Sequence, residues 1–282
     1  MKLASYEASG RRTWGVILGE EAFDAGAVLR DRYPDLKSMI AAGAYAEAEA
    51  AMQSAPRQKL DELLWLPVIP NPDKILCVGV NYETHRLETG RAAVAHPTIF
   101  TRFANSQTAH MRNILLPRVS TNLDFEGELA IVIGRAGRYI QRESALDHIA
   151  GFSCYNDGSI RDWQNHSHQF TPGKNFPQTG AFGPWMVTLD ELGELGDLHI
   201  CTRLNGQVVQ DAQLNQMIFD IPTIVEYCSS FTRLECGDVI ATGTPGGVGA
   251  KRTPPLWMKV DDTVEIEIER VGILRNVIAA EA

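Results

Sequence analysis

The stretch LDFEGELAIVIGR, residues 123–135, places Glu126 and Glu128 at the start of an apolar run. The run LAIVIG has the composition of a buried strand. Side chains two residues apart on a strand point to the same face, so the two Cα atoms would lie roughly 6–7 Å apart. Like charges at that distance repel unless a cation lies between them. The pair therefore predicts either a solvated charged strand end or a site for Mg²⁺ or Mn²⁺, which prefer oxygen ligands.

Four further blocks of sequence place polar residues beside strand-like or glycine-rich text. Asp157 lies in GFSCYNDGSIRDWQ, and Lys174 lies in the glycine- and proline-rich loop TPGKNFPQTG. His85 and Glu88 stand three apart in KILCVGVNYETHRLETG, and ECGDVIATGTPGGVG runs from a strand into a glycine-rich turn. In this order the blocks resemble the fumarylacetoacetate hydrolase superfamily. The resemblance extends from about Asp73 to the end of the chain.

The resemblance implies a metal site built from three carboxylates, Glu126, Glu128 and Asp157, that holds Mg²⁺ or Mn²⁺. Three protein ligands leave octahedral positions open for water or substrate. Asp124 shares the strand face of the two glutamates but sits one pair earlier. Asp162 is expected to pair with an arginine or to cap a turn. Neither is predicted to be a ligand.

His85 and Glu88 are the predicted catalytic base and its partner. Residues three apart can share a helical face, and a carboxylate that orients one imidazole nitrogen makes the other a better base. An arbitrary histidine is more often structural, but the resemblance implies an H-x-x-E pair on a short lid, which Gly79 and Gly90 could hinge. Lys174 is either a solvated loop lysine or, as the resemblance implies, an inward-pointing catalytic residue that stabilises an oxyanion.

Four residues are candidates for substrate binding. Arg161 and Gln164 follow Asp157 by four and seven residues, spacings that fit one helical face. Gln164 is expected to bind substrate, whereas Arg161 either binds substrate or is structural. Thr244 belongs to a glycine-rich turn that is either ordinary or a cradle of N–H groups for a carboxylate. Arg102 could bind the far carboxylate of a diacid.

The resemblance implies a hydrolase that cleaves the C–C bond of a 2,4-dioxo acid, an acylpyruvate or a diketo acid, to pyruvate and a carboxylic acid. His85 would activate the water that attacks C4, and the metal would stabilise the enolate. The same site could decarboxylate oxaloacetate or isomerise hydroxymuconate-type acids. A non-catalytic binding protein is the third alternative, against which the His85–Glu88 pair argues. Nothing in the sequence identifies the group beyond the dioxo core.

Composition narrows the class of protein. The net charge of −9 argues against nucleic-acid binding, because no basic stripe exists to neutralise phosphates. No run approaches the ~20 apolar residues of a membrane span, and the first residues do not form a signal peptide. Five scattered cysteines indicate reduced thiols and a cytoplasmic enzyme. The resemblance implies a homodimer built through the large domain.

The predicted organisation is a small N-terminal α/β module, residues 1–70, followed by a catalytic domain, residues 71–282. The module is expected to begin with two strands around Ala8-Ser9-Gly10 and then to turn helical from Asp24 to Leu64. The three prolines of LWLPVIPNPDK mark the boundary.

Short strand-like runs dominate the rest of the chain, so the main domain should be a β-rich roll or barrel in a mixed α+β fold. Asn205-Gly206 indicates a hairpin, and the alternating VEIEIE a half-exposed strand. IPTIVEYCSSFT and SALDHIAG are expected to be helical.

Overall fold

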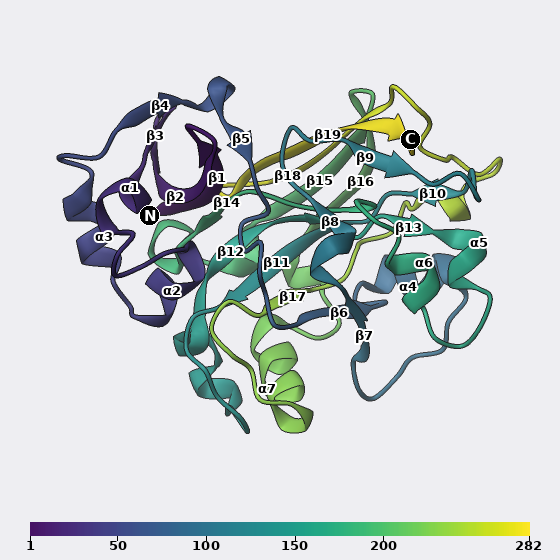
Figure 1. Cartoon of the computed structure of the whole chain (residues 1–282). Coiled ribbons are helices and arrows are strands. Elements are labelled where there is room, and N and C mark those ends of the chain that lie inside the picture. The colour runs from purple at the N-terminus through teal and green to yellow at the C-terminus, as the bar shows by residue number, and fades with distance from the viewer.

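The computed structural model of the protein describes residues 1–282 (Figure 1). Strands outnumber helices, which confirms the β-rich α+β class. The strands are β1 (Lys2–Ala8), β2 (Arg11–Leu18), β3 (Glu21–Phe23), β4 (Arg57–Lys59), β5 (Leu64–Trp65), β6 (Ile75–Gly79), β7 (Thr98–Arg102), β8 (Gln107–Thr108), β9 (Ile114–Leu116), β10 (Leu123–Asp124), β11 (Gly127–Ile133), β12 (Ile149–Asn156), β13 (Ser159–Ile160), β14 (Gly180–Val187), β15 (His199–Leu204), β16 (Gln207–Gln213), β17 (Val239–Ala241), β18 (Thr263–Ile268) and β19 (Gly272–Ala280). The α-helices are α1 (Ala25–Leu29), α2 (Leu36–Ala41), α3 (Tyr45–Ala51), α4 (Glu83–Thr89), α5 (Arg161–Gln164), α6 (Thr171–Lys174) and α7 (Ile221–Phe231).

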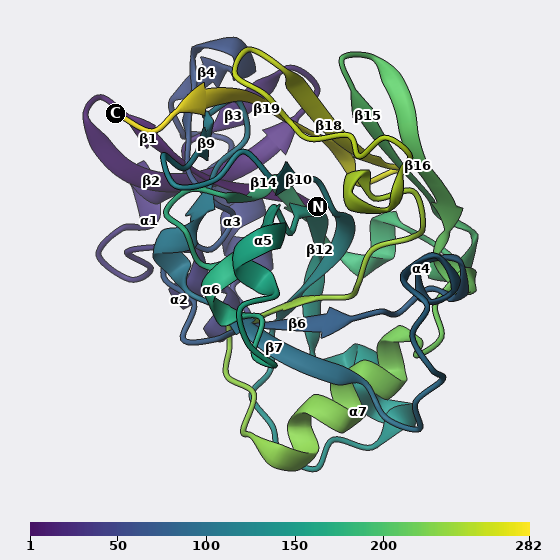
Figure 2. The same cartoon turned by 90° about the vertical axis from the view of Figure 1, so that its right-hand side faces the viewer.

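The strands form one long sheet and one shorter sheet that packs beside it. The 12-stranded sheet has the order β4-β3-β2-β1-β14-β12-β11-β17-β6-β7, with β5 beside β1 and β8 beside β14. The 5-stranded sheet has the order β16-β15-β18-β19-β9, and β10 pairs with β13 separately. Figure 2 shows β15, β16 and β18 of the shorter sheet above β12 and β6 of the long sheet, with α7 below.

Strand β11 is buried on both of its faces, which explains its continuous apolar sequence. Leu129, Ile131 and Ile133 belong to a hydrophobic cluster that they share with β18 and β19 of the shorter sheet. Ala130 and Val132 belong to a second cluster, which includes residues of α2. Because side chains alternate along a strand, one strand contributes to both layers of the core.

The two predicted hairpins and the half-exposed strand are confirmed. Ser9 and Gly10, between β1 and β2, have φ of 50° and 73°, and Asn205 and Gly206, between β15 and β16, have φ of 52° and 79°. Left-handed backbone at both central residues matches the twist of the flanking strands. Strand β18, which contains VEIEI, alternates buried and half-buried positions.

The N-terminal segment is less helical than expected. Helices α1, α2 and α3 are short, and the segment ends in β4 and β5 rather than in a helix. Strand β1 pairs with β14, so residues 1–70 continue the long sheet of the main domain. The division of the chain near residue 70 stays a prediction.

Of the two helices predicted in the main domain, one is confirmed and the other is wrong. IPTIVEYCSSFT is helical as α7, capped by Asp220, whose side chain accepts from the Thr223 N–H. SALDHIAG was predicted to be one helix, which is wrong: a 3₁₀ helix ends at His148, and the chain then enters β12. The residues from Ile149 onward pair with β11 and β14, so sheet packing overrides the local preference.

The pairing of β11 with β12 positions the predicted acidic residues. The strands are antiparallel, with Gly127 opposite Asn156. The start of β11 and the end of β12 therefore lie at the same edge, and the Asp157 N–H donates to the Glu126 carbonyl at 2.9 Å. In Figure 1, α4, α5 and α6 lie at this end, across the molecule from the N-terminal helices.

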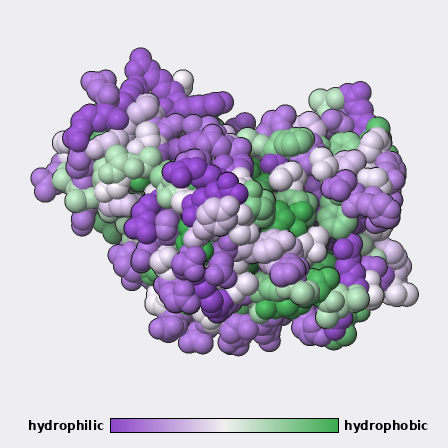
Figure 3. All heavy atoms as spheres, turned by 90° about the horizontal axis from the view of Figure 1, so that it is seen from below, coloured by the Kyte–Doolittle hydropathy of each residue, from purple (hydrophilic) through white to green (hydrophobic).

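The face shown in Figure 3 is mostly hydrophilic, and the cysteines form no disulfide. Hydrophilic residues cover most of the face shown in Figure 3, with hydrophobic residues gathered in patches between them. None of the helices has the length and apolar character needed to cross a membrane. All five cysteines are free, and all but Cys236 are buried.

Candidate active site

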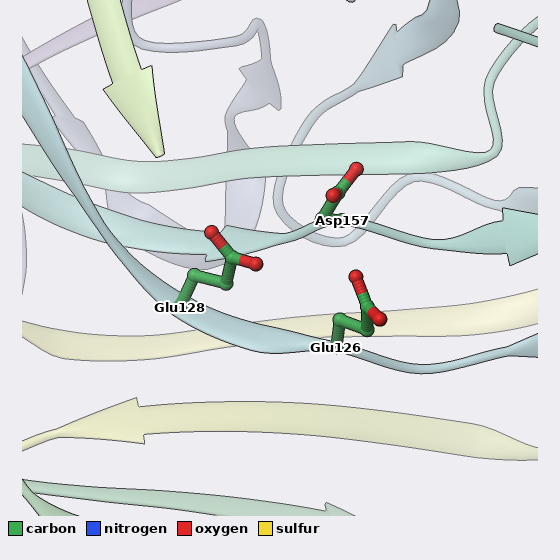
Figure 4. A group of neighbouring side chains, drawn as sticks. All are labelled: Glu126, Glu128 and Asp157. Carbon is green, nitrogen blue, oxygen red and sulfur yellow. The ribbon is translucent and has the colours of Figure 1, made fainter. Parts of the chain in front are cut away.

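Three buried carboxylates converge at the edge where β11 begins and β12 ends. Glu126 immediately precedes β11, Glu128 lies within it, and Asp157 directly follows β12. One oxygen of each lies within 4.8 Å of the others. Figure 4 shows the three carboxyl groups close to one another at the ends of neighbouring strands. The structure thus brings together the three residues predicted as metal ligands.

Two of these carboxylates are neutralised by cations of the chain itself. Lys174 Nζ lies 2.6 Å from Glu126 Oε2 and 2.6 Å from Asp157 Oδ2. Arg161 Nη2 donates to Glu126 Oε1 at 2.7 Å. Glu128 has no such partner, and its Oε2 accepts only the Gly243 N–H, at 2.8 Å. The cluster therefore contains one buried carboxylate without a cation.

This arrangement shifts the pKa values of the two glutamates in opposite directions. Burial favours the neutral form of Glu126, but the charges of Arg161 and Lys174 outweigh it and hold the pKa below its usual value. Burial raises the pKa of Glu128, and the neighbouring charges of Asp157 and Glu126 raise it further. A divalent cation among the three would remove this conflict, and hard oxygen ligands suit Mg²⁺ and Mn²⁺. The residues fit such an ion.

His85 and Glu88 form the predicted pair on helix α4. His85 Nδ1 and Glu88 Oε1 lie 2.7 Å apart, and His85 is only 5% exposed. Glu88 Oε2 accepts the Gly247 N–H at 2.9 Å, which joins the helix to the glycine-rich turn. Gly90 ends the helix with φ of 68°, whereas Gly79 has no left-handed backbone. The pair leaves Nε2 of the imidazole as the nitrogen free for proton transfer.

One cavity is lined by His85 and by two members of the acidic cluster, Glu126 and Glu128. It has a volume of about 390 Å³, within the range of small-molecule sites. The chemically important lining residues are His85, Glu126, Glu128, Arg161, Gln164, Lys174 and Thr244. Lys174 is buried in this wall, which excludes the solvated loop lysine considered above.

Arg161 and Gln164 line the cavity from α5, but not for the reason that their spacing suggested. Helix α5 begins only at Arg161, so Asp157 lies in the turn before β13 and shares no helical face with them. Arg161 donates to Asp124 Oδ2 at 2.8 Å and to Gln164 Oε1 at 2.9 Å, besides its contact with Glu126. These contacts favour the structural alternative for Arg161, at the wall of the site, and its role in substrate binding stays a prediction.

The glycine-rich turn binds carboxylates of the protein rather than presenting a free cradle. The N–H groups of Gly243 and Gly247 donate to Glu128 and Glu88. The Thr244 hydroxyl donates to the Gly127 carbonyl at 2.9 Å. The turn thus orients both the acidic cluster and the partner of His85, and its predicted role as a substrate cradle is wrong for these two N–H groups.

Arg102 is buried and does not line the cavity, which argues against its predicted role in substrate binding. Nη1 donates to Asp157 Oδ1 at 2.5 Å, and Nη2 donates to the Thr179 hydroxyl at 3.0 Å. Arg102 holds Asp157 from behind the cluster.

Sequence reasoning missed several residues of the site. Asp124 is buried and holds Arg161, and Asp162 lines the cavity while accepting from the Ser120 hydroxyl at 2.7 Å instead of pairing with an arginine. Arg91 also lines the cavity. Its place directly after the glycine that ends the H-x-x-E segment was the only available signal.

Comparison with known proteins places this site in a family. Residues 74–279 match the family described as "Fumarylacetoacetate (FAA) hydrolase C-terminal". A site of buried carboxylates beside a histidine, on this sheet, defines a class of enzymes that act on keto acids. The chain belongs to the fumarylacetoacetate hydrolase family.

Individual relatives include enzymes with different reactions. A mitochondrial oxaloacetate tautomerase of Bos taurus is 41% identical over 217 residues, which cover 76% of this chain and 69% of that protein. A fumarylacetoacetate hydrolase of Exiguobacterium antarcticum has a TM-score of 0.88 and 34% identity over the full length of both chains. A maleylpyruvate hydrolase of Sphingobium sp. SYK-6, in complex with manganese(II) and pyruvate, has a TM-score of 0.82 and 26% identity, also over both full lengths.

Proposed function

We propose that the protein is a Mg²⁺- or Mn²⁺-dependent hydrolase that cleaves a 2,4-dioxo acid to pyruvate and a second carboxylic acid. The observation that carries this proposal is that His85, which Glu88 holds, lines the same cavity as Glu126 and Glu128 of the three-carboxylate cluster. A base beside a metal site is needed when water must act as the nucleophile. The maleylpyruvate hydrolase relative with bound manganese and pyruvate supports the same chemistry.

Glu126, Glu128 and Asp157 would hold the ion. When bound, Mg²⁺ or Mn²⁺ would supply Lewis-acid stabilisation of the enolate of a 2-oxo acid. His85 Nε2 takes a proton from water as the water oxygen bonds to C4 of the substrate. Lys174 supplies a buried positive charge near the oxyanion that forms there.

The C3–C4 bond then breaks, and its electron pair remains on C3 as the enolate of pyruvate. His85, now protonated and held by Glu88, returns the proton to C3. Gln164 and Arg161 line the wall against which the substrate lies. Burial of His85 and Lys174 limits the access of bulk water to the reacting atoms.

A second candidate is the keto–enol tautomerisation of oxaloacetate. The tautomerase of Bos taurus favours it, because its identity to this chain exceeds that of the maleylpyruvate hydrolase. In this reaction His85 would remove a proton from C3 of the substrate instead of from water. Decarboxylation of oxaloacetate would pass through the enolate of pyruvate, and isomerisation of hydroxymuconate-type acids would pass through a dienolate, so both also require stabilisation of an enolate of a 2-oxo acid.

One panel of assays separates these reactions. Pyruvate release from acetylpyruvate, loss of the enol absorbance of oxaloacetate and loss of oxaloacetate itself are measured with Mg²⁺, with Mn²⁺ and with EDTA. We expect metal-dependent hydrolysis to be the fastest reaction, and His85→Ala to slow it more than any decarboxylation. Faster tautomerisation, with no pyruvate from any acylpyruvate, would replace the hydrolase assignment by the tautomerase one.

We further propose a homodimer built through the main domain, as the family resemblance suggests. Light scattering at micromolar concentration should give twice the mass of the 31.1 kDa chain. A single peak at the monomer mass contradicts this proposal.

A further inference from the structure

Two cationic side chains line the cavity without any carboxylate partner. They are Arg91, which follows α4, and Lys251, which ends a short 3₁₀ turn. Neither side chain forms an ion pair within 4.0 Å or donates a hydrogen bond within the chain, whereas Arg161 and Lys174 are both paired. The cations deep in the site are therefore committed to carboxylates of the chain, whereas these two exposed cations are free.

Arg91 is held in place even though its charge is free. The Arg91 N–H donates to the Arg86 carbonyl at 3.2 Å, and Arg86 Nη1 donates back to the Arg91 carbonyl at 2.8 Å. These bonds form where Gly90, with its left-handed φ of 68°, ends α4. The guanidinium lies 5.1 Å from the centre of the Phe170 ring, and Phe170 lines the same cavity. The backbone bonds hold the main chain of Arg91, and the ring contact places its exposed guanidinium over Phe170.

A fixed and unpaired guanidinium beside a substrate cavity is suited to bind a carboxylate. The planar group offers two parallel donors to the two oxygens, and this geometry adds specificity to the charge attraction. Lys251 is the weaker candidate, because a lysine offers a flexible point charge and no aromatic ring holds this one. The buried Arg102 has neither access nor a free donor pair.

We propose that Arg91 determines specificity by receiving a second carboxylate at the far end of the substrate, so that the preferred substrates are dioic 2-oxo acids. This inference rests on the proposed function, in which the first carboxylate and the 2-oxo group lie at the acidic cluster. Arg91 adjoins the helix that bears His85, so a substrate that engages Arg91 also holds the base over the reacting carbons.

Calorimetry with two non-cleavable acids tests this inference without turnover. 2-Oxoglutarate and 2-oxopentanoate share a five-carbon chain and a 2-oxo acid end, but only the former has a distal carboxylate. Each is titrated into the Mg²⁺-loaded wild-type protein and the Arg91→Met and Arg91→Lys variants. We expect wild type to prefer 2-oxoglutarate and Arg91→Met to reduce the ratio of the two affinities by about 10- to 100-fold, the usual loss on removing a hydrogen bond to a charged group. Arg91→Lys should retain part of the preference.

Arg138→Met is the matched control. Arg138 also lies over an aromatic ring, 4.6 Å from the centre of Tyr139, but it does not line the cavity. This variant should keep the wild-type ratio. A preference that survives Arg91→Met, or that disappears in Lys251→Met alone, overturns the assignment to Arg91.

The same experiment separates this inference from the proposed function. If neither acid binds in the presence of Mg²⁺, the proposed function fails and the inference fails with it. If both acids bind wild type equally well, the 2-oxo acid site stands and only the role of Arg91 is overturned. The turnover of an acylpyruvate with a terminal carboxylate, compared with one ending in a methyl group, should show the same change of ratio in kcat/KM.

Discussion

Two regions built on the long sheet, the N-terminal strands and the strand ends where β11 begins, bury opposite kinds of side chain. In the N-terminal region, the core between β2 and the first helices is apolar, with Trp14, Leu36 and Met39 fully buried. Polar groups there mainly cap helices, as Asp35 does for α2. In the other region, where β11 begins, acidic and basic side chains such as Glu128 and Lys174 are just as deeply buried.

The difference shows which region stabilises the fold and which region provides the reactive groups of the site. Burial of apolar surface stabilises a fold by about 25 cal/mol per Å². Burial of charge is unfavourable unless a partner compensates for it, and even a paired charge seldom improves on an apolar substitute. The charged region therefore costs stability, and the unpaired Glu128 marks where a bound cation would compensate. The predictions below separate the two contributions.

The largest effect is expected from Glu128→Gln. Loss of this carboxylate should weaken Mg²⁺ binding and lower kcat/KM by about 10⁴-fold, the equivalent of roughly 5 kcal/mol of transition-state stabilisation. The metal-free variant should be no less stable than wild type, because the substitution removes a buried charge that lacks a cation. Activity, metal titration and urea unfolding in EDTA measure the three effects. The exposed Glu143→Gln is the control, and a Glu128→Gln protein with normal turnover would place the metal site elsewhere.

The next effect is expected from His85→Ala. The rate should fall roughly 10²–10⁴-fold, the usual contribution of a general base. Mg²⁺ affinity should stay the same, because His85 is bonded to Glu88 and not to the acidic cluster. His199→Ala is a matched control, since His199 also pairs with a carboxylate, that of Asp211, but lies outside the cavity. Full activity of His85→Ala would exclude this residue from the mechanism.

In the apolar region, Trp14→Ala should change stability and leave the chemistry alone. Trp14 is 0% exposed, and its indole N–H donates to the Tyr33 carbonyl at 2.9 Å. Removal of the ring should lower the free energy of unfolding by about 3–5 kcal/mol, with kcat/KM unchanged in the fraction that remains folded. Leu18→Ala, at an exposed position of the same strand, should cost less than about 0.5 kcal/mol. A fall of kcat/KM in the folded fraction would show that the apolar region and the charged region are coupled.

The smallest effect is expected at a surface charge, in Asp220→Asn. The Arg142 guanidinium beside Asp220 lowers the pKa of its carboxyl to about 2. A lowered pKa in the folded state means that the charge contributes stability above the unfolded value, near pH 4, and that this contribution is lost as the pH falls toward 2. Asparagine keeps the cap on α7, so the substitution should cost only about 0.2–1 kcal/mol at pH 7 for this solvent-screened pair. Urea unfolding at pH 7 and pH 3 should show a difference that shrinks on acidification, and growth of the difference would contradict the assigned sign.

Local sequence determined much of the fold and part of the site. The apolar run after Glu128 lies in strand β11, and Asn205-Gly206 forms the predicted hairpin turn between β15 and β16. The alternating sequence near the C-terminus forms β18. The pair His85 and Glu88 meets on one helical turn, because a spacing of three residues is a local property. Strands, turns and helical pairs depend on neighbouring residues and on the side-chain period, so they can be predicted without knowledge of distant contacts.

Tertiary structure alone decided which charges meet. Lys174 reaches Glu126 across 48 positions of sequence, and Arg102 reaches Asp157 across 55. The sequence predicted that Arg102 binds substrate, whereas packing buries it behind the acidic cluster. Arg91, which the sequence did not mark as a site residue, lines the cavity. The sequence, through the family resemblance that its motifs carry, indicated that carboxylates, a histidine and a lysine belong to one site. Pairing between strands far apart in the chain decided their partners and pKa shifts, because Coulomb energies and desolvation depend on distance and burial in space and not on separation along the chain.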